Sequence, residues 1–344
     1  MSRHLPRIAI NGFGRIGRAL TRIAAKDAQC PFELVAFNDL GELQALSYLL
    51  KYDSVHGQLD LPVAVDGSSI QVGGLRLRSF AMRDPSQLPW GDLQVDLVVE
   101  ATGHFRKRSQ AALHIAAGAK QGVISAPGDA TDRPDATVVY GINEASIGED
   151  AKVISAASCT TTCLAPVAKT LHEQFQIIAG NMTTVHAWTA AQGLVDGADA
   201  KDPRRGRSGA VNIVPTSTGA AKAIGLVVPE VADLLHGSAF RVPVQDVSLI
   251  DLVVKVKRRT SVDEINGVLS EAEQTYLPGV IRVERAPVVS SDLIGETSGS
   301  VIDAACTAVP GDDLIRVVAW YDNEWSYASR LYALMCAQAI RLGA

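Results

Sequence analysis

The sequence lacks any apolar run of the ~20 residues that a membrane-spanning helix requires, and no apolar leader precedes the first predicted strand at Arg7. It also lacks a cysteine framework. Its five cysteines, at positions 30, 159, 163, 306 and 336, form neither a Cys-x-x-Cys pair for zinc nor an even set for disulfides. These absences predict a cytoplasmic protein with reduced thiols, no membrane association and no metal site.

An excess of basic charge is missing as well. Lys and Arg number 32 against 37 acidic residues, which gives a net charge of -5, so a dedicated nucleic-acid site is not expected. No repeat, charge block or low-complexity linker interrupts the 344 residues, of which 47% are hydrophobic. A chain of this length exceeds what one hydrophobic core usually supports, so we expect two packed domains.

A short apolar strand near the N terminus, residues 7–11, leads into a glycine pattern and a helix. Gly12, Gly14 and Gly17 have the spacing Gly-x-Gly-x-x-Gly, and the helix should continue to residue 25. The first glycine permits a tight turn, the second lets the backbone approach a pyrophosphate, and the third allows helix and strand to pack closely. Taken alone, the pattern also fits an ordinary strand–turn–helix joint.

A second apolar strand, residues 33–39, ends in Asp39, 22 residues after Gly17. A carboxylate at this place binds the ribose hydroxyls of a dinucleotide and repels the extra phosphate of NADP, which favours NAD. The alternative is that Asp39 only caps a loop.

Further strands at residues 94–103 and 122–127 alternate with a helix that should run to about residue 117. This alternation predicts a parallel doubly wound sheet, with ligands at the carboxyl ends of its strands. Thr102, Gly103 and Ser125 should therefore lie near the cofactor. The histidines of this half of the chain have no spacing that distinguishes them from ordinary surface or core residues.

Cys159 stands at the first turn of a predicted helix, residues 159–175. The free N–H groups and the positive end of the helix dipole at such a position stabilise a thiolate, which makes Cys159 a candidate nucleophile. His186, on a predicted strand over 177–188, is a candidate base that would take the thiol proton and keep the thiolate ready near neutral pH. The residues alone also allow a small buried cysteine, and spacing does not single out His186.

The second half of the chain has the alternation of an antiparallel sheet covered on one face, most clearly over residues 240–257. The segment from Thr189 to Asn212 reads as a long basic loop, and hydroxyl residues from Pro215 begin what we expect to be a helix with an anion site at its first turn. A last helix, from Trp325, should pack back on the first domain.

Several long motifs follow one another in the order found in the phosphorylating glyceraldehyde-3-phosphate dehydrogenases, and the chain closely resembles this family from end to end. They are Asn-Gly-Phe-Gly-Arg-Ile-Gly-Arg at 11–18, Lys-Tyr-Asp-Ser-Val-His-Gly at 51–57, Ala-Ser-Cys-Thr-Thr at 157–161, Thr-Ser-Thr-Gly-Ala-Ala-Lys at 216–222, Arg-Val-Pro at 241–243 and Trp-Tyr-Asp-Asn-Glu at 320–324.

The resemblance implies an α/β fold: a Rossmann-type doubly wound parallel sheet over residues 1–157, and an α+β catalytic domain with a largely antiparallel sheet over 158–324. The C-terminal helix, 325–344, would pack on the first domain. It also implies a role in glycolysis, a homotetramer and NAD as cofactor.

The family mechanism then assigns the chemistry to Cys159 and His186. Cys159 would attack the aldehyde of glyceraldehyde 3-phosphate to form a thiohemiacetal, and His186 would accept the proton. Hydride transfer to NAD would leave a thioester, which inorganic phosphate cleaves to 1,3-bisphosphoglycerate. The Cys159 N–H and the His186 side chain would stabilise the oxyanion.

The resemblance also gives roles to binding residues. The cofactor-binding positions are Asn11, Gly12, Gly14, Arg15, Ile16, Asp39, Arg83, Thr102, Gly103, Ser125 and Asn323. Thr189 and Arg241 match positions for the terminal phosphate of the substrate, and Ser158, Thr160, Arg205, Thr218 and Gly219 match those for the attacking phosphate.

The chain departs from the family pattern at a few positions. Thr162 stands where the family has asparagine, Ala191 where it has aspartate and Gly193 where it has arginine. Gly197-Ala198 replaces bulkier residues of strictly NAD-specific members, which leaves some use of NADP open.

Two alternatives remain at this point. Residues 135–141 are similar to erythrose-4-phosphate dehydrogenases, although 218–222 looks more like the triose enzyme. The second alternative is a weakly active paralogue that senses oxidants or binds partners, with Cys163 resolving an oxidised Cys159.

Overall fold

The structure, a computed structural model, describes residues 5–200 and 202–343. Its contacts divide the chain into two compact units: unit 1 runs up to Ala157 and resumes at Leu331, and unit 2 comprises Ser158–Arg330. The last helix, α8 (Trp325–Leu342), begins at the predicted residue, and its first turns, up to Arg330, fall in unit 2. Its start is fixed there because Asp322 Oδ1 accepts the N–H groups of Glu324 and Trp325. No helix in the described ranges is long and apolar enough to cross a membrane.

Unit 1 is built on a nine-stranded sheet with the order β3-β4-β5-β2-β1-β6-β7-β9-β8. Its strands pair in parallel except for the hairpins β3–β4 and β4–β5. The bounds are β1 (Arg7–Asn11), β2 (Glu33–Asn38), β3 (Val63–Asp66), β4 (Ser69–Val72), β5 (Leu75–Phe80), β6 (Leu97–Glu100), β7 (Gln121–Ile124), β8 (Ala136–Thr137) and β9 (Val153–Ser155). The doubly wound parallel sheet predicted from the sequence is confirmed.

The helices of unit 1 are α1 (Arg15–Lys26), α2 (Leu43–Lys51), α3 (Arg108–Ala111) and α4 (Leu113–Ala116), with α8 contributing its later turns. The single helix expected up to residue 117 is thus two short ones. The break has a visible cause: the N–H of Ala112 bonds to Arg108 four residues back, whereas that of Ile115 bonds to Ala112 only three back.

A buried polar network crosses the sheet of unit 1. Glu100, at the end of β6, accepts a hydrogen bond from Asn11 Nδ2 at 2.5 Å and faces His114 Nε2 at 3.0 Å. His114 in turn accepts from Trp90 Nε1 at 3.1 Å. Every one of these side chains is buried, and their mutual bonds remove the desolvation penalty that unpaired polar groups would carry. The network joins the ends of β1 and β6 to α4 and to the segment before β6 that contains Trp90.

Unit 2 holds a seven-stranded sheet with the order β11-β12-β10-β13-β16-β15-β14. The pairs β10–β12 and β14–β15 are parallel and the others antiparallel, as predicted for a largely antiparallel sheet. The strands are β10 (Ile177–Ala187), β11 (Val214–Ser217), β12 (Leu235–Val242), β13 (Ser248–Val256), β14 (Ile281–Glu284), β15 (Ser300–Asp303) and β16 (Leu314–Tyr321).

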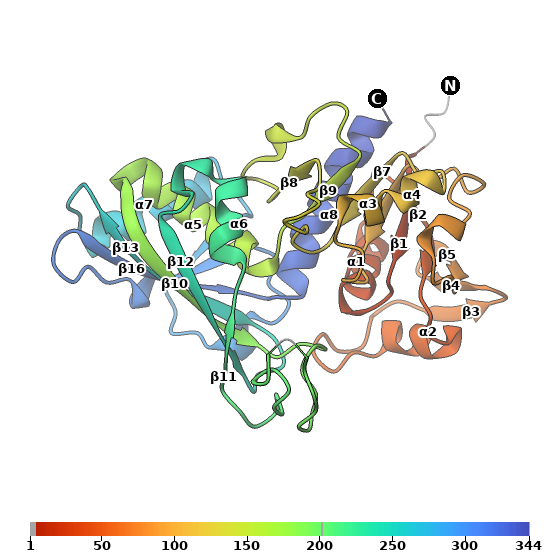
Figure 1. Ribbon diagram of the computed structural model, residues 1–344, viewed down its shortest axis with the longest axis horizontal. Coiled ribbons are helices and arrows are strands. Elements are labelled where there is room, and N and C mark those ends of the chain that lie inside the picture. The colour runs from red at the N-terminus through yellow and green to blue at the C-terminus, as the bar shows by residue number, and fades with distance from the viewer. Residues whose placement is uncertain (1–4, 201, 344) are drawn as a thin grey trace. The chain divides into compact units, whose positions relative to one another are not determined.

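Three helices of unit 2, α5 (Cys159–Phe175), α6 (Ala220–Val227) and α7 (Val262–Gln274), contact these strands; α5 touches β10, β13, β15 and β16 (Figure 1). The strand expected over 240–257 is wrong: it is two strands, separated by a turn in which Val247 adopts a left-handed φ of 66°. The helix expected from Pro215 is also wrong at its start, because residues 214–217 pair with β12 and the helix begins at Ala220.

Close packing of α1 against β1 depends on Gly17. A Cβ at this position would overlap the carbonyl oxygen of Gly12, and would also lie 3.3 Å from Ile10 Cγ2. A Cβ at Gly14 would meet nothing within 4 Å. The two glycines of one turn therefore differ in their steric requirement.

We predict that Gly17→Ala lowers the free energy of unfolding by about 1–3 kcal/mol, because overpacking forces α1 away from β1. Urea unfolding followed by circular dichroism measures this loss. Gly14→Ala is the matched control and should unfold within about 1 kcal/mol of the wild type. Equal losses in the two variants would show that close helix–strand packing is not the reason for Gly17.

Candidate active site

A pocket of about 420 Å³ lies in unit 1 at the carboxyl ends of β1, β2 and β6. Residues predicted for the cofactor line it from each of these places: Asn11, Gly12, Gly14, Asp39, Arg83 and Thr102. Arg15, Ile16 and Gly103 are their neighbours in sequence, and Ser125 donates its N–H to the carbonyl of Glu100. The sequence thus named residues that the parallel sheet gathers at one edge.

The turn after β1 has the geometry that a dinucleotide needs. Gly12 has a φ of 97°, and a Cβ there would lie 2.6 Å from the N–H of Thr102, so only glycine fits. Gly14 leaves open space at the first turn of α1, where N–H groups bind phosphate. Asp39 accepts the N–H groups of Phe13 at 2.7 Å and Gly41 at 2.8 Å. It is therefore a loop cap as well as a carboxylate facing the pocket.

Two residues near this pocket, Asn11 and Glu100, have side chains that hydrogen-bond within the sheet. Both polar groups of the Asn11 side chain are occupied inside the sheet: Nδ2 donates to Glu100, and Oδ1 accepts from Asn38 at 2.7 Å. Glu100, which the sequence analysis did not single out, also accepts the N–H of Thr102 at 2.9 Å and its hydroxyl. Its position, as an acidic residue at the end of an apolar strand, is the feature of the sequence from which this role could have been predicted.

Arg15 is held by Asp53, from the motif at 51–57. Its guanidinium donates to both carboxylate oxygens of Asp53, which also accepts the N–H groups of Val55 and His56 at 2.9 Å each. Burial opposes ionisation, but Arg15 and the two N–H groups outweigh it and hold the pKa of Asp53 well below its ordinary value. The motif therefore orients a cation at the first turn of α1.

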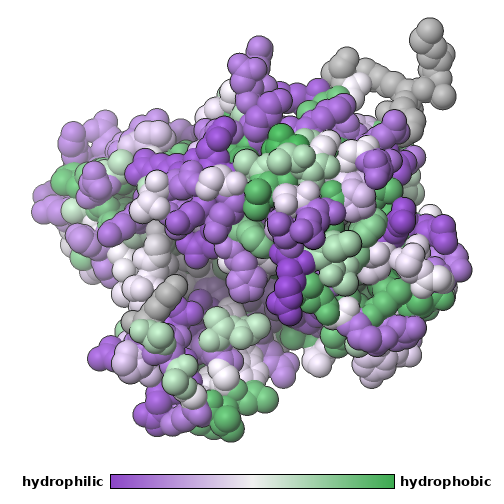
Figure 2. Space-filling model, turned by 45° about the vertical axis from the view of Figure 1, so that its right-hand side comes forward, coloured by the Kyte–Doolittle hydropathy of each residue, from purple (hydrophilic) through white to green (hydrophobic). Residues whose placement is uncertain are grey.

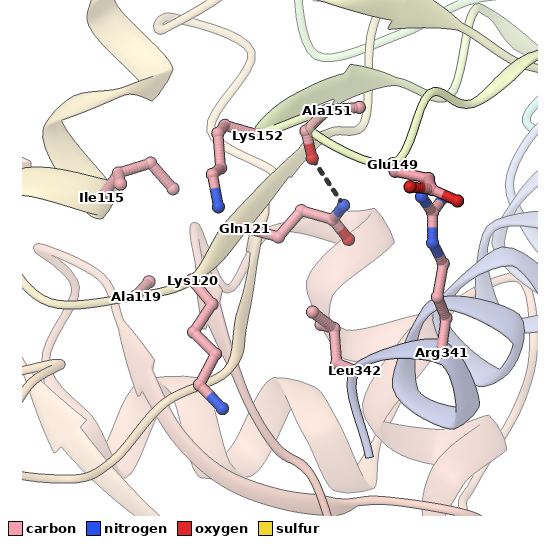
Figure 3. Close-up of a pocket in the computed structure, with 9 residues that line it drawn as sticks. All are labelled: Ile115, Ala119, Lys120, Gln121, Glu149, Ala151, Lys152, Arg341 and Leu342. Carbon is pink, nitrogen blue, oxygen red and sulfur yellow. Dashed lines mark hydrogen bonds between the residues drawn. The ribbon is translucent and has the colours of Figure 1, made fainter. Parts of the chain in front are cut away.

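A second pocket of unit 1, of about 260 Å³, is drawn in Figure 3. Three of its polar side chains are engaged, although the buried Gln121 Oε1 has no hydrogen-bond partner among the described residues. Lys120 pairs with Asp96 at 2.7 Å, Gln121 Nε2 donates to Ala151 O, and Arg341 donates to the carbonyls of Ile147 and Gly148. The contacts of Arg341 tie the end of α8 to the segment that precedes β9.

In unit 2, Cys159 is the first residue of α5, as the sequence predicted. Ser158 caps the helix by accepting the N–H of Thr161 at 3.1 Å, while Ala157 before it has a left-handed φ of 56°. This strained entry turns the chain sharply into the helix. The Cys159 sulfur therefore lies among the free N–H groups of the first turn.

His186, on β10, faces this sulfur: its Nε2 lies 3.5 Å from Cys159 Sγ. The other ring nitrogen, Nδ1, lies 2.7 Å from the carbonyl oxygen of Ala187 and 2.6 Å from Nη1 of Arg241. Tyr321 packs edge-on to the imidazole, with ring centroids 5.9 Å apart. The fold thus selects His186 from seven histidines as the partner of the thiol.

Burial and nearby charge act on the protonation of this pair. Burial raises the pKa of the Cys159 thiol, outweighing Arg241 and the N–H and hydroxyl of Thr160, which favour the thiolate. Burial and then the charge of Arg241 lower the pKa of His186 to about 3. Burial therefore opposes the charged form of each group in the ligand-free site, while Arg241 favours the thiolate and opposes the imidazolium.

One cation, Arg241, lies close enough to the thiol to act on its charge, and two further predicted anion ligands lie in the same unit. Arg241, at the end of β12, has its pKa lowered by burial and further by the charge of Arg205, so two predicted phosphate ligands lie near each other. Gly219 precedes α6, whose first turn has no side-chain cap bond, and Thr218 Oγ1 accepts only the N–H of Ala220 at 3.2 Å. This helix terminus is suited to an anion.

Two of the remaining predicted phosphate ligands, Thr160 and Ser158, have hydroxyl groups that are already hydrogen-bonded to other residues. The hydroxyl of Thr160 is paired with Tyr321 at 2.9 Å, and that of Ser158 with Thr161 at 2.8 Å. Thr189 follows the end of β10 and is exposed. A phosphate at Ser158 and Thr160 would therefore be bound mainly through backbone N–H groups at the start of α5.

Asn323 is coupled to the strand that carries the base. Its Oδ1 accepts from Ser248 Oγ at 2.6 Å, and the same Ser248 Oγ accepts the N–H of Ala187 at 3.0 Å. The amide NH₂ of Asn323 remains as a donor. Ser248 was not predicted, and nothing in its sequence position marked it.

The three positions that depart from the family pattern, Thr162, Ala191 and Gly193, differ in their burial and in the space around them. Thr162 is buried in α5 and its methyl group packs close to Gly299. At position 193 a Cβ would lie 2.9 Å from the carbonyl oxygen of Val195, so the loop conformation favours glycine, while Ala191 is exposed. Cys163 is fully buried against the carbonyls of Ala319 and Trp320, and burial raises its pKa to about 12.

The Arg15–Asp53 pair supplies a pH-dependent test. We predict that Asp53→Asn lowers the free energy of unfolding at pH 7 by about 1–3 kcal/mol, the usual contribution of hydrogen bonds to a charged group. The folded pKa lies below the unfolded one, so this stabilisation is present above about pH 4 and is lost as the pH falls through the folded pKa. Urea unfolding at pH 7 and pH 3 should show the difference from wild type shrinking. Asp66→Asn, which removes an exposed partner of Arg76, is the control and should change little.

The comparisons with known proteins agree with this geometry. Residues 158–323 match the family model of the glyceraldehyde 3-phosphate dehydrogenase C-terminal domain, and 6–108 match that of its NAD binding domain. The chain is 48% identical to a glyceraldehyde-3-phosphate dehydrogenase of Geobacillus stearothermophilus over 95% of its own length and 96% of the relative's. It is 46% identical to glyceraldehyde-3-phosphate dehydrogenase 1 of Bacillus subtilis, with the same coverage. The identity to a Mycobacterium bovis glyceraldehyde-3-phosphate dehydrogenase is 48% over 96% and 97%. The chain therefore belongs to the glyceraldehyde 3-phosphate dehydrogenase family.

Proposed function

We propose that this protein oxidises glyceraldehyde 3-phosphate with NAD and inorganic phosphate to give 1,3-bisphosphoglycerate and NADH. The observation that carries the proposal is the thiol of Cys159 at 3.5 Å from an imidazole, beside the half-buried guanidinium of Arg241. A nucleophile, a base and an anion ligand are what a phosphorylated aldehyde requires. The relatives of 46–48% identity are named as glyceraldehyde-3-phosphate dehydrogenases.

Unit 2 supplies the reacting groups. Cys159 Sγ bonds to the aldehyde carbon, and His186 Nε2 accepts the proton, which gives a thiohemiacetal. The Cys159 N–H and the imidazole then stabilise charge on the carbonyl oxygen. After oxidation to the thioester, an oxygen of inorganic phosphate attacks the carbonyl carbon, the carbon–sulfur bond breaks, and Cys159 leaves as a thiolate that regains a proton from His186.

Unit 1 supplies the cofactor pocket, and its residues fit NAD. Gly12, Gly14 and the first turn of α1 would hold the pyrophosphate, and Asp39 the ribose hydroxyls. NAD, when bound, supplies the acceptor for the hydride that leaves the substrate carbon. Asp39 disfavours NADP, because a phosphate would face this carboxylate. Asn323, through its free NH₂, is assigned to the nicotinamide amide.

The two phosphate roles are divided as the family implies. Arg241 and Thr189 would bind the terminal phosphate of the substrate. Arg205, Thr218, Gly219 and the start of α5 at Ser158 and Thr160 would bind the attacking phosphate. The proximity of Arg205 and Arg241 supports two anions in adjacent places.

The alternatives receive less support. None of the relatives reported above is named as an erythrose-4-phosphate dehydrogenase. A redox sensor that uses Cys163 as the resolving thiol is disfavoured by the complete burial of this cysteine and by its raised pKa, both of which suppress thiolate chemistry.

We also propose a homotetramer assembled in part through the loop from Thr189 to Asn212. Large apolar side chains on and next to this loop are exposed, namely Leu194, Val195, Val211 and Ile213. Apolar side chains gather at the lowest part of the molecule in Figure 2, where this loop lies in Figure 1. Two described parts of the loop are joined by an Arg207–Asp196 pair at 2.7 Å and by a hydrogen bond from the Ser208 N–H to Asp196. Clustered exposed apolar surface is typical of an interface.

We propose a cytoplasmic location because the cysteines form no disulfides. All five are free in the structure, as expected in a reducing compartment.

We predict that Cys159→Ser reduces NADH formation by about a thousandfold or more, since the hydroxyl is a far weaker nucleophile. NAD binding, measured by calorimetry, should remain, because the pocket of unit 1 contains no part of Cys159. Cys306→Ser, which replaces a half-buried thiol elsewhere in unit 2, is the control and should keep wild-type turnover. Loss of both turnover and NAD binding in Cys159→Ser would assign this cysteine a structural role instead.

The tetramer is tested by replacing exposed valines. Val195→Asp and Val211→Asp, each at a side chain that is 77% exposed, should shift the protein from tetramers to smaller species in light scattering after gel filtration. A carboxylate in an apolar interface is costly to desolvate. The matched control is Val289→Asp, at a position 57% exposed, which should stay tetrameric. A wild-type protein that is monomeric at micromolar concentration would contradict the assembly itself.

A further inference from the structure

The pocket of about 260 Å³ in unit 1 lies apart from the cofactor pocket. Its walls come from α4, from the start of β7, from the segment that leads into β9 and from the end of α8. No described residue lines both pockets. At roughly 30 Å³ for each water molecule, the space is that of about nine waters, which suits a small organic molecule.

One polar atom of this pocket is left without a partner. Gln121, at the start of β7, is 4% exposed, and its Nε2 donates to the carbonyl oxygen of Ala151 at 3.0 Å. That bond fixes which way the amide faces, because a carbonyl oxygen only accepts. The other amide atom, Oε1, has no hydrogen bond to any described residue. A buried acceptor in this state costs free energy until a donor reaches it.

Two lysines lie on one side of this acceptor. In Figure 3 the ammonium groups of Lys120 and Lys152 are on the same side of the Gln121 side chain. Lys120 pairs with Asp96 at 2.7 Å. Within residues 5–200 and 202–343, no carboxylate pairs with the side chain of Lys152. Lys152 is therefore a cation that an anionic ligand can neutralise.

Arg341, at the end of α8, lies on the other side of Gln121 in Figure 3. Its guanidinium donates to the carbonyls of Ile147 and Gly148, which engages two of its five N–H donors. None of the described carboxylates pairs with it. The remaining donors are available to a carboxylate or a phosphate, which a planar guanidinium binds well.

The rest of the lining limits what can bind. Among the described residues that line the pocket, Glu149 is the one acid against three cations, so the pocket favours an anion. Its apolar surface is supplied by Ile115, Ala119, Ala151 and Leu342. A short carbon chain with an anionic group at each end and a hydrogen-bond donor between them matches this arrangement of cations, acceptor and apolar surface.

We propose that this pocket binds a small hydroxylated dianion, whose anionic groups pair with the two lysines at one end and with Arg341 at the other, and whose hydroxyl donates to Gln121 Oε1. Malate, a hydroxydicarboxylate, has these groups in this order. Because Oε1 is buried, a lining side chain has to shift to admit the hydroxyl. The half-exposed Leu342, which lies beside Gln121 in Figure 3, is placed to do so.

The site goes beyond the proposed function, since it uses none of the residues assigned to NAD, to either phosphate or to the thiol chemistry. Calorimetric titration of the full-length protein with malate and with succinate, at equal ionic strength, tests the ligand class. We expect saturable binding of malate with a Kd of about 1 mM or lower. Succinate has the two carboxylates without the hydroxyl and should bind about tenfold or more weakly, because it leaves Oε1 without a donor.

Two results of this titration would overturn the proposal, and neither needs a variant. Absence of saturable malate binding would show that water alone fills the pocket. Equal binding of malate and succinate would remove the contact with Gln121 Oε1, on which the choice of a hydroxylated ligand depends.

Methyl NMR shows where the ligand binds. The δ1-methyl signal of Ile115, identified by its loss in Ile115→Val, should shift with malate, while that of Ile302 in unit 2 should not. 3-Phosphoglycerate, in which a phosphate replaces one carboxylate, is titrated in the same way. The dianion that saturates the Ile115 shift at the lower concentration identifies the second anionic group. A malate shift confined to unit 2 would contradict the proposed site.

A lysine variant tests the charge of the pocket. Lys152→Gln removes the unpaired cation and should weaken malate binding about tenfold or more. Lys26→Gln, at an exposed lysine in the last turn of α1 that does not line the pocket, is the matched control and should bind malate like the wild type. NADH formation should be unchanged in both variants, so failure of this site and failure of the proposed function are distinguishable. Wild-type malate affinity in Lys152→Gln would place the ligand elsewhere and refute the assignment.

Discussion

The approach of one sulfur to one nitrogen, Cys159 Sγ and His186 Nε2 at 3.5 Å, is the constraint on which the chemistry of unit 2 depends. It requires a helix that starts at a fixed residue and a strand in a fixed register. Ser158 fixes the first by capping α5. The pairing of β10 with β12 and β13 fixes the second, and it also places Arg241 opposite His186 in the ladder.

That register has a further effect on electrostatics. Because His186 and Arg241 are cross-strand partners, a half-buried cation lies against the base and, after burial, lowers the pKa of the imidazole. In unit 1 the residues around the cofactor pocket are held by hydrogen bonds to two carboxylates, Glu100 and Asp53. These bonds leave the cofactor pocket preformed.

Much of the fold was predictable because its signals are local. Helix α5 begins and ends at the predicted residues, 159 and 175. The errors occurred where tertiary pairing overrides local pattern. Residues 214–217 carry hydroxyl and proline residues typical of a helix start, yet they form an edge strand because β12 offers them partners. The turn before β13 was missed because Val247 adopts a left-handed φ that valine rarely takes.

The sequence by itself determined the glycine pattern, the carboxylate after β2, the thiol at a helix start and the family to which these motifs belong, since each is a property of neighbouring residues. Only the tertiary structure decided which of seven histidines meets the thiol, that Asn11 and Glu100 support the pocket from inside the sheet, and that Arg241 lies behind the imidazole. These are contacts between residues far apart in the chain. Their distances are set by strand register and helix packing, and no local pattern encodes the protonation that burial imposes.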